Sequence, residues 1–246
     1  MKAGERFDRN YGASSGNADF SENWDFETDR IRISGSSDFE NAEARIIEIS
    51  GSARIKRSVR CDRLECSGSL ETGGELTSKA INVSGSIKIG GNMRSVGARI
   101  SGRCAVVGNY VSDETNCTGS IECGGDLESR NIEIAGRLAA ASIAADSISL
   151  NGGGRAETVR CGDIRINMDR HGRSHFGLLH RWKSGNRFAA ERMEVSGSAS
   201  LSNCSIAELR ARRALISGGC VVDKLYYSES FVVEEDGIVR ERIRQQ

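Results

Sequence analysis

The chain has 246 residues, with 34 lysines and arginines against 34 aspartates and glutamates, so its formal net charge is zero. A chain without net charge has no global field to attract nucleic acid, and we expect no nucleic-acid partner. Aromatic residues make up only 5% of the chain, which has 29 glycines and no proline. We therefore expect a core of small and β-branched residues that is built many times over, not one aromatic-rich globular core.

The cellular compartment is predicted from the membrane-spanning and secretory segments that the sequence lacks. No apolar run approaches the roughly 20 residues that span a bilayer. Residues 1–10 hold no apolar segment of the kind that marks a secretory signal. We expect a cytoplasmic protein, either free or held against a membrane surface. In that reducing compartment the eight cysteines are predicted to be free, buried thiols.

Residues 1–29 precede any repeat. They are polar and rich in asparagine and serine, with scattered aromatic residues such as Phe7 and Trp24. This composition is typical of a disordered tail. The alternative is that the aromatic side chains make it a docking arm.

Residues 30–168 carry an internal repeat, which dominates the sequence. A Ser-Gly pair or a close variant recurs every 16 or 17 residues, and the pattern returns at Gly197 and Gly218. The first eight of these glycines are Gly35, Gly51, Gly68, Gly85, Gly102, Gly119, Gly136 and Gly152. A fixed period of this length indicates a solenoid in which each repeat is one coil.

Apolar residues fall into columns when the repeats are aligned on the glycine. One column, eight residues after the glycine, holds Val59, Leu76, Met93, Tyr110 and Leu127. Within a repeat the apolar spacing is two, which is typical of strands and excludes helices. The glycine itself is expected at a corner where the backbone is left-handed or crowded.

The predicted fold class is therefore all-β, a right-handed parallel β-helix with coils of about 17 residues. About eleven coils at the spacing of neighbouring strands would give a rod of roughly 50 Å. The right hand follows from the general preference of parallel crossovers. The left-handed rival would need a six-residue apolar step, which the sequence does not show.

Residues 169–190 interrupt the repeat with a basic insert that holds all three histidines, His171, His175 and His180. One reading is an apolar cap on the rod. The other is a contact for an anionic partner or a membrane surface, for which the candidate residues are Arg173, Phe176, Trp182, Lys183 and Arg187. A zinc site is disfavoured, because Gly172 and Gly177 weaken any helix that would align two histidines.

Residues 191–246 are predicted to be the last coils and a cap. The Ser-Gly mark is lost after Val221, and Val239 to Gln246 is expected to be solvated surface. Apolar and aromatic residues concentrate just before it. An open solenoid end is an exposed strand edge, so these residues are the candidate polymer contact: Leu225, Tyr226, Phe231, Val232 and Val233.

No catalytic, cofactor or metal residues are predicted. The sequence has no phosphate-binding loop, no dinucleotide fingerprint and no nucleophile elbow. Glu48 and Glu65 fall in equivalent positions of adjacent coils, beside basic columns, which suggests charge mixing on the surface. We expect no enzyme. The carboxylate-lined groove of a carbohydrate-active β-helix remains the least favoured alternative.

The repeat units IRISGSSDF, IIEISGSARI and AINVSGSIKI resemble those of the bactofilins, polymer-forming cytoskeletal proteins of bacteria and archaea. The ending CVVDKLYYSESFVVEEDGIVRERI is similar to that of the longer members. The resemblance covers residues 30–168 and 191–243. It implies a scaffold that assembles end to end with itself into nucleotide-independent filaments, often under the membrane. The alternative is a binding module that uses the insert at 169–190.

Overall fold

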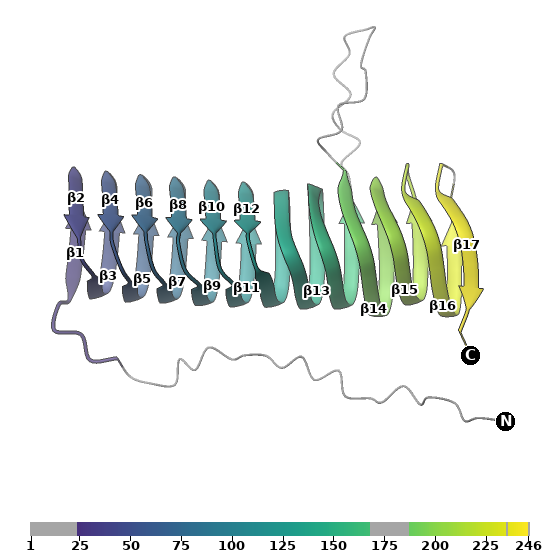
Figure 1. Cartoon of the computed structure of the whole chain (residues 1–246), viewed down its shortest axis with the longest axis horizontal. Coiled ribbons are helices and arrows are strands. Elements are labelled where there is room, and N and C mark those ends of the chain that lie inside the picture. Colours follow the sequence, from purple (N-terminus) through teal and green to yellow (C-terminus); the bar gives the residue numbers. More distant parts are fainter. Residues whose placement is uncertain (1–23, 168–186, 235, 246) are drawn as a thin grey trace, which may run out of the picture.

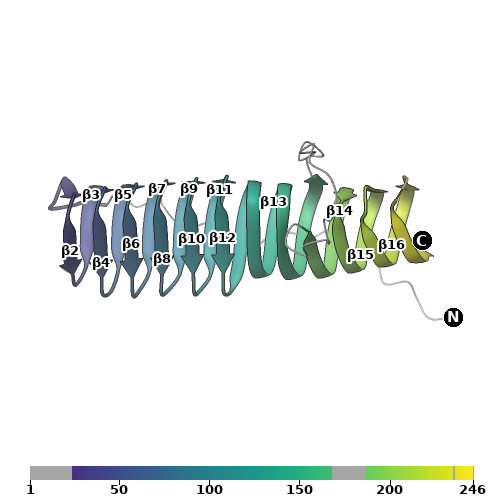
Figure 2. The same cartoon turned by 90° about the horizontal axis from the view of Figure 1, so that it is seen from above.

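The computed structural model describes residues 24–167, 187–234 and 236–245, which form one parallel β-solenoid of about eleven turns and contain no helix (Figure 1). The predicted fold class and the coil length of about 17 residues are thus confirmed. Seen from above, the coils stack in single file along one axis (Figure 2). The strands are β1 Arg30–Ile33, β2 Ser36–Phe39, β3 Ala42–Ile49, β4 Ser52–Ile55, β5 Val59–Cys66, β6 Ser69–Thr72, β7 Leu76–Val83, β8 Ser86–Ile89, β9 Met93–Ile100, β10 Arg103–Val106, β11 Tyr110–Cys117, β12 Ser120–Cys123, β13 Asp126–Asn167, β14 Phe188–Ser202, β15 Cys204–Ser217, β16 Val221–Val233 and β17 Ile238–Arg244.

Each coil has three sides. In the second coil, side A (residues 42–45) and side B (residues 46–49) together make β3, and side C is β4. Two side chains of each side point inward, and in this coil they are Ala42, Ala44, Ile47, Ile49, Ala53 and Ile55. Each of them stacks on its equivalent in the next coil, as Ile47 does on Leu64. The predicted apolar columns are therefore the core.

The turn between sides C and A explains why the period alternates between 16 and 17. In the 17-residue coils three residues link the two sides, for example residues 56–58 between the buried Ile55 and Val59. Two residues do so in the first coil, between Phe39 and Ala42, and again from the middle of β13 onward, as at 157–158 between Ala156 and Val159. In the later coils sides C and A run on as one strand, which is why the later strands are longer.

The recurring glycines lie at the corner between sides B and C, and they are needed because of crowding. A Cβ on Gly68 or Gly102 would overlap the carbonyl oxygen of the glycine one coil below, and neither residue has a positive φ. Of the two reasons predicted for this column, close backbone approach holds at these two positions, and a positive φ occurs at two other members, Gly152 (154°) and Gly218 (49°). Gly35 differs, since a Cβ there would meet nothing within 4 Å among the described residues.

The insert replaces one of these glycine corners. Ile166 is the last inward residue of side B before it, and Phe188 is the first of side C after it, aligned with Gly154 and Cys204. Strand β14 begins at Phe188, so residues 188–190, which the sequence assigned to the insert, belong to the solenoid.

Two further sequence interpretations are corrected. The Ser196-Gly197 pair does not continue the glycine column, because Val159 pairs with Met193 and Ile164 with Ala199, which places Gly197 between sides A and B. The repeat also does not stop at Val221. Strands β16 and β17 continue it in parallel register, and the ending predicted to be solvated surface forms the last strand, whose described residues are exposed or partly exposed.

Candidate functional site

Few side chains on the described surface are candidates for metal binding or catalysis. Among residues 24–167, 187–234 and 236–245 no group of three histidine, cysteine, aspartate or glutamate side chains is placed to hold a metal ion. No helix in those ranges is long and apolar enough to cross a bilayer. The three histidines of the insert lie outside the described residues.

Six cysteines are free thiols in the core, as predicted. Burial raises the pKa of Cys61, Cys104 and Cys161 to about 12 and that of Cys66 to about 11. A thiol with so high a pKa stays protonated at neutral pH, and the thiolate is the nucleophile. These side chains therefore act as small apolar core residues.

The other two cysteines correct the prediction that all eight are free. Cys204 and Cys220 stack in the same inward column of side C and form a disulfide, with a sequence separation of 16 residues. The sequence analysis predicted free thiols from the expected compartment and overlooked that a separation of one coil places two cysteines in direct contact.

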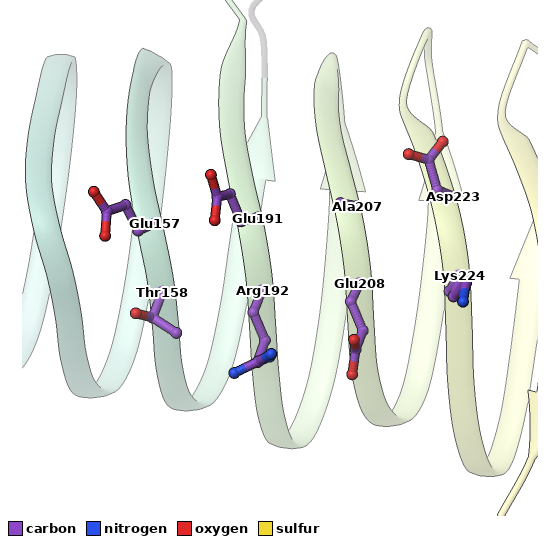
Figure 3. Close-up of a pocket in the computed structure, with 8 residues that line it drawn as sticks. All are labelled: Glu157, Thr158, Glu191, Arg192, Ala207, Glu208, Asp223 and Lys224. Carbon is purple, nitrogen blue, oxygen red and sulfur yellow. The ribbon is translucent and has the colours of Figure 1, made fainter.

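A shallow groove of about 420 Å³ crosses four coils at the turn between sides C and A (Figure 3). Its lining is Glu157, Thr158, Glu191, Arg192, Ala207, Glu208, Asp223 and Lys224. Arg240 pairs with Asp223 at 3.0 Å, and Glu241 lies 3.9 Å from Lys224. No serine, cysteine or histidine is among these lining residues, and their carboxylates lie beside the cations Arg192 and Lys224, which is the mixed charge of a solvated ladder.

The stacked carboxylates Glu48 and Glu65 also lack the character of an acid catalyst. The two residues pair in adjacent coils, as predicted. Arg32 donates a hydrogen bond to Glu48 at 2.7 Å and lowers the pKa of that carboxyl group. A general acid needs the opposite shift.

The five predicted polymer contacts occupy different depths near the C-terminal end of the rod. Leu225 is fully buried in the core, and Tyr226 is half-buried beneath the guanidinium of Arg210, 4.8 Å from its ring. Phe231 and Val233 are partly buried on the last layer of side B, whereas Val232 points outward and is 54% exposed.

Of the predicted partner contacts in the insert, Arg173, Phe176, Trp182 and Lys183 lie outside the described residues. Arg187 is described, and its guanidinium donates to the carbonyl oxygens of Gly219 (2.5 Å) and Cys204 (3.3 Å). These hydrogen bonds join the start of β14 to the next two coils.

The N-terminal coil presents an open edge. Strand β1 pairs only with β3 and β2 only with β4, so within the described chain their other edges carry unpaired backbone groups. The inward positions of this coil are Ile31, Ile33, Ser37 and Phe39, by their register with the core of the second coil. None of the four is charged. The sequence reasoning considered only the other end and missed this edge.

The segment before β1 leads away from this edge. The ring of Trp24 lies under two cations on the flank of the rod, 4.7 Å from the guanidinium carbon of Arg60 in β5 and 5.2 Å from Nζ of Lys79 in β7. The trace therefore passes beneath the first coils instead of crossing the end face (Figure 1). These residues belong to the predicted disordered tail, of which residues 1–23 lie outside the described structure.

The C-terminal coil has the same backbone edge with different side chains. Strand β17 pairs with β16 and is the last described strand. In register, Val239 stacks on Val222, but Arg242 stacks on the buried Leu225 and Arg244 on Tyr227. The sequence contained this signal, since residue 242 lies 17 positions after Leu225.

No family model, curated protein or solved structure matches the chain. The structure shows the fold class of the protein, which is a parallel β-solenoid of about eleven turns. The resemblance to the bactofilins stays a prediction.

Proposed function

We propose that this protein is a non-enzymatic structural scaffold that assembles without nucleotide by stacking its N-terminal coil on that of a second copy. The observation that carries the proposal is the edge of β1 and β2, which is unpaired in the described chain and has the apolar inward residues Ile31, Ile33 and Phe39. Such an edge adds another strand through main-chain hydrogen bonds.

A two-fold axis through the Gly35 corner joins two such edges. Strand β1 runs toward this corner and β2 runs away from it, so the axis places β1 of one copy antiparallel to β2 of the other. Residues whose numbers add to 70 then face each other. Ile31 faces Phe39 and Ile33 faces Ser37, so inward positions meet inward positions and the core continues across the contact. The contact is isologous, the usual form in homodimers.

Charge favours the same arrangement. The outward residues of β1 are Arg30 and Arg32, and those that follow the corner are Asp38 and Glu40. About the two-fold axis Arg32 faces Asp38 and Arg30 faces Glu40, twice over. Opposite charges on neighbouring strands are stabilising, and like charges there are destabilising. Gly35 provides the space, because a Cβ there would meet nothing within 4 Å of the described chain.

The resemblance to the bactofilins would extend such pairing into filaments only if the C-terminal end, where the predicted contact residues Phe231 and Val233 lie, made a contact as well. A cytoplasmic site of action remains part of the proposal. The six free thiols of the core support it, and the Cys204–Cys220 disulfide speaks against it. The alternative, a binding module centred on residues 169–190, rests on residues that are mostly outside the described structure.

The test is the mass of the purified protein in solution, measured by light scattering over a range of concentrations. The wild type should self-associate without nucleotide. Phe39→Arg places a charge in an inward column of the edge and should abolish association. Val107→Arg places the same charge on an outward residue that is 62% exposed, far from the edge, and should leave association unchanged. A wild type that stays monomeric at every concentration would overturn the proposal.

A further inference from the structure

Two core columns of side A end on arginine. One runs through Val59, Leu76, Met93, Tyr110, Leu127 and on to Leu225, each with an exposed fraction of 1% or less, and its next member is Arg242. The neighbouring column passes through Ala211 and Tyr227 to Arg244. Inward positions of the described coils before β17 are apolar or, as at Ser78 and Ser112, small and hydroxyl-bearing, and none is charged, because the next coil buries them. An arginine in such a position would be buried without a partner if another coil were stacked on it.

Arg242 also covers the adjoining side of the end face. Side B of the last coil, with Phe231 and Val233, has no strand above it in the described chain. The guanidinium carbon of Arg242 lies 5.3 Å from the centre of the Phe231 ring. Phe231 in turn contacts Tyr227, with ring centres 4.6 Å apart. Arg242 thus covers Phe231, which packs against Tyr227. The outermost group of this stack is the solvated guanidinium of Arg242.

We propose that Arg242 closes the C-terminal end of the rod against strand stacking, so that assembly stops at a pair of rods joined by their N-terminal coils. This inference rests on the proposed function for the pairing itself. An inward-pointing charge on an edge strand is a known protection against edge-to-edge pairing, because a stacked strand would have to bury it.

Charge also opposes contact between two C-terminal ends. Strand β17 carries Arg240, Arg242 and Arg244 against the single acid Glu241, which lies 3.9 Å from Lys224 on the outer surface. Two such strands brought edge to edge would repel each other. The N-terminal edge has the opposite property, since arginines on β1 face acids after the corner in the two-fold arrangement.

Electron microscopy of the purified chain tests the closure. The wild type should give particles two rods long, about 100 Å at the usual strand spacing. Arg242→Leu/Arg244→Leu makes both inward positions of β17 apolar, and it should lengthen the particles to several rods. Arg240→Leu is the control, since it removes a charge from an outward position of the same strand, and its particles should keep the wild-type length. Wild-type filaments of many rods would overturn the closure, and so would particles of the Arg242→Leu/Arg244→Leu variant that stay two rods long.

A second arm separates this inference from the proposed function. In the Phe39→Arg background the N-terminal edge is blocked, and the protein should be monomeric by light scattering. Adding Arg242→Leu/Arg244→Leu to that background should produce dimers through the C-terminal end, whereas adding Arg240→Leu should not. A triple variant that remains monomeric would overturn the closure even where the wild type pairs. A monomeric wild type whose Phe39→Arg/Arg242→Leu/Arg244→Leu form dimerises would refute the proposed function and leave the closure standing.

Discussion

The first and last coils of this rod both expose the edge of a strand. They differ in the side chains at the inward positions, which decide what can stack on each end. At the N-terminal end the inward positions hold Ile31, Ile33, Ser37 and Phe39. At the C-terminal end two of the inward positions hold Arg242 and Arg244. A solenoid exposes a strand edge at each end, so whether an end is open depends on a few residues in its core columns and not on the fold.

Substitutions in the glycine column should give the largest difference in stability between the interior of the rod and its N-terminal end. Gly102→Ala would force a Cβ into the carbonyl group of Gly85, and we expect a loss of about 3 kcal/mol in unfolding free energy, at the upper end for overpacked sites. Gly35→Ala has no coil beneath it and should leave the stability of the isolated rod nearly unchanged. Urea denaturation of both variants under monomeric conditions makes the comparison.

Gly35→Ala should still weaken self-association, because the two-fold contact brings the backbone of the second copy against this corner. Equal destabilisation of the rod by the two alanine variants would contradict the account of the corner. Association of Gly35→Ala at wild-type strength would contradict the placement of the axis.

The period and the columns could be predicted from the sequence because each coil repeats the same physical demand. A side chain that the next coil buries must be uncharged and is mostly apolar, and the corner between sides B and C has no room for a Cβ. The strand register after the insert could not be predicted in the same way. Ser196-Gly197 has the letters of the glycine corner, yet it lies at another corner, since one added residue in a turn shifts the alignment without changing the local pattern.

The ends were the least predictable part. Arg242 breaks the apolar rule that made the columns visible, so the sequence reasoning assigned its stretch to solvated surface. Leu225 was assigned to the exposed end, but β17 covers it. The Cys204–Cys220 disulfide was missed for a related reason, since only the correct register shows that the two cysteines occupy one column.

That disulfide is a covalent link between the last coils, and among the described residues the N-terminal coils have no counterpart. Cys204→Ser should lower the stability by about 3 kcal/mol, the effect of closing a loop of about this length. The loss should be larger in oxidising buffer, and in reducing buffer it should fall to the cost of exchanging a buried thiol for a hydroxyl, because Cys204 is fully buried. Cys104→Ser, a change at a free buried thiol, should cost the same in both buffers. A Cys204→Ser loss that does not depend on the redox state would contradict the link.

The interior between the two ends should be sensitive to alkaline pH. Burial raises the pKa of Cys61 and Cys161 to about 12, above the ordinary thiol value of 9.0. The protonated thiol is thus favoured by folding, so this contribution is complete below pH 9 and is lost as the pH rises toward 12. Each such thiol should reduce the stability by up to about 1.4 kcal/mol per pH unit in that range. Urea midpoints at pH 8 and pH 10.5 measure the loss, which Cys61→Ala should make smaller. An equal loss in the variant would contradict the role of this thiol.

The two-fold contact at the N-terminal coil is tested most directly by exchanging its charges between copies. Arg32→Asp alone and Asp38→Arg alone each set like charges against each other across the axis, so each protein should be monomeric by light scattering. In a mixture of the two proteins every facing pair at these positions is opposite in charge, and dimers should form between the variants. The account predicts this rescue by mixing. Variants that pair with themselves as the wild type does, or a mixture that stays monomeric, would contradict it.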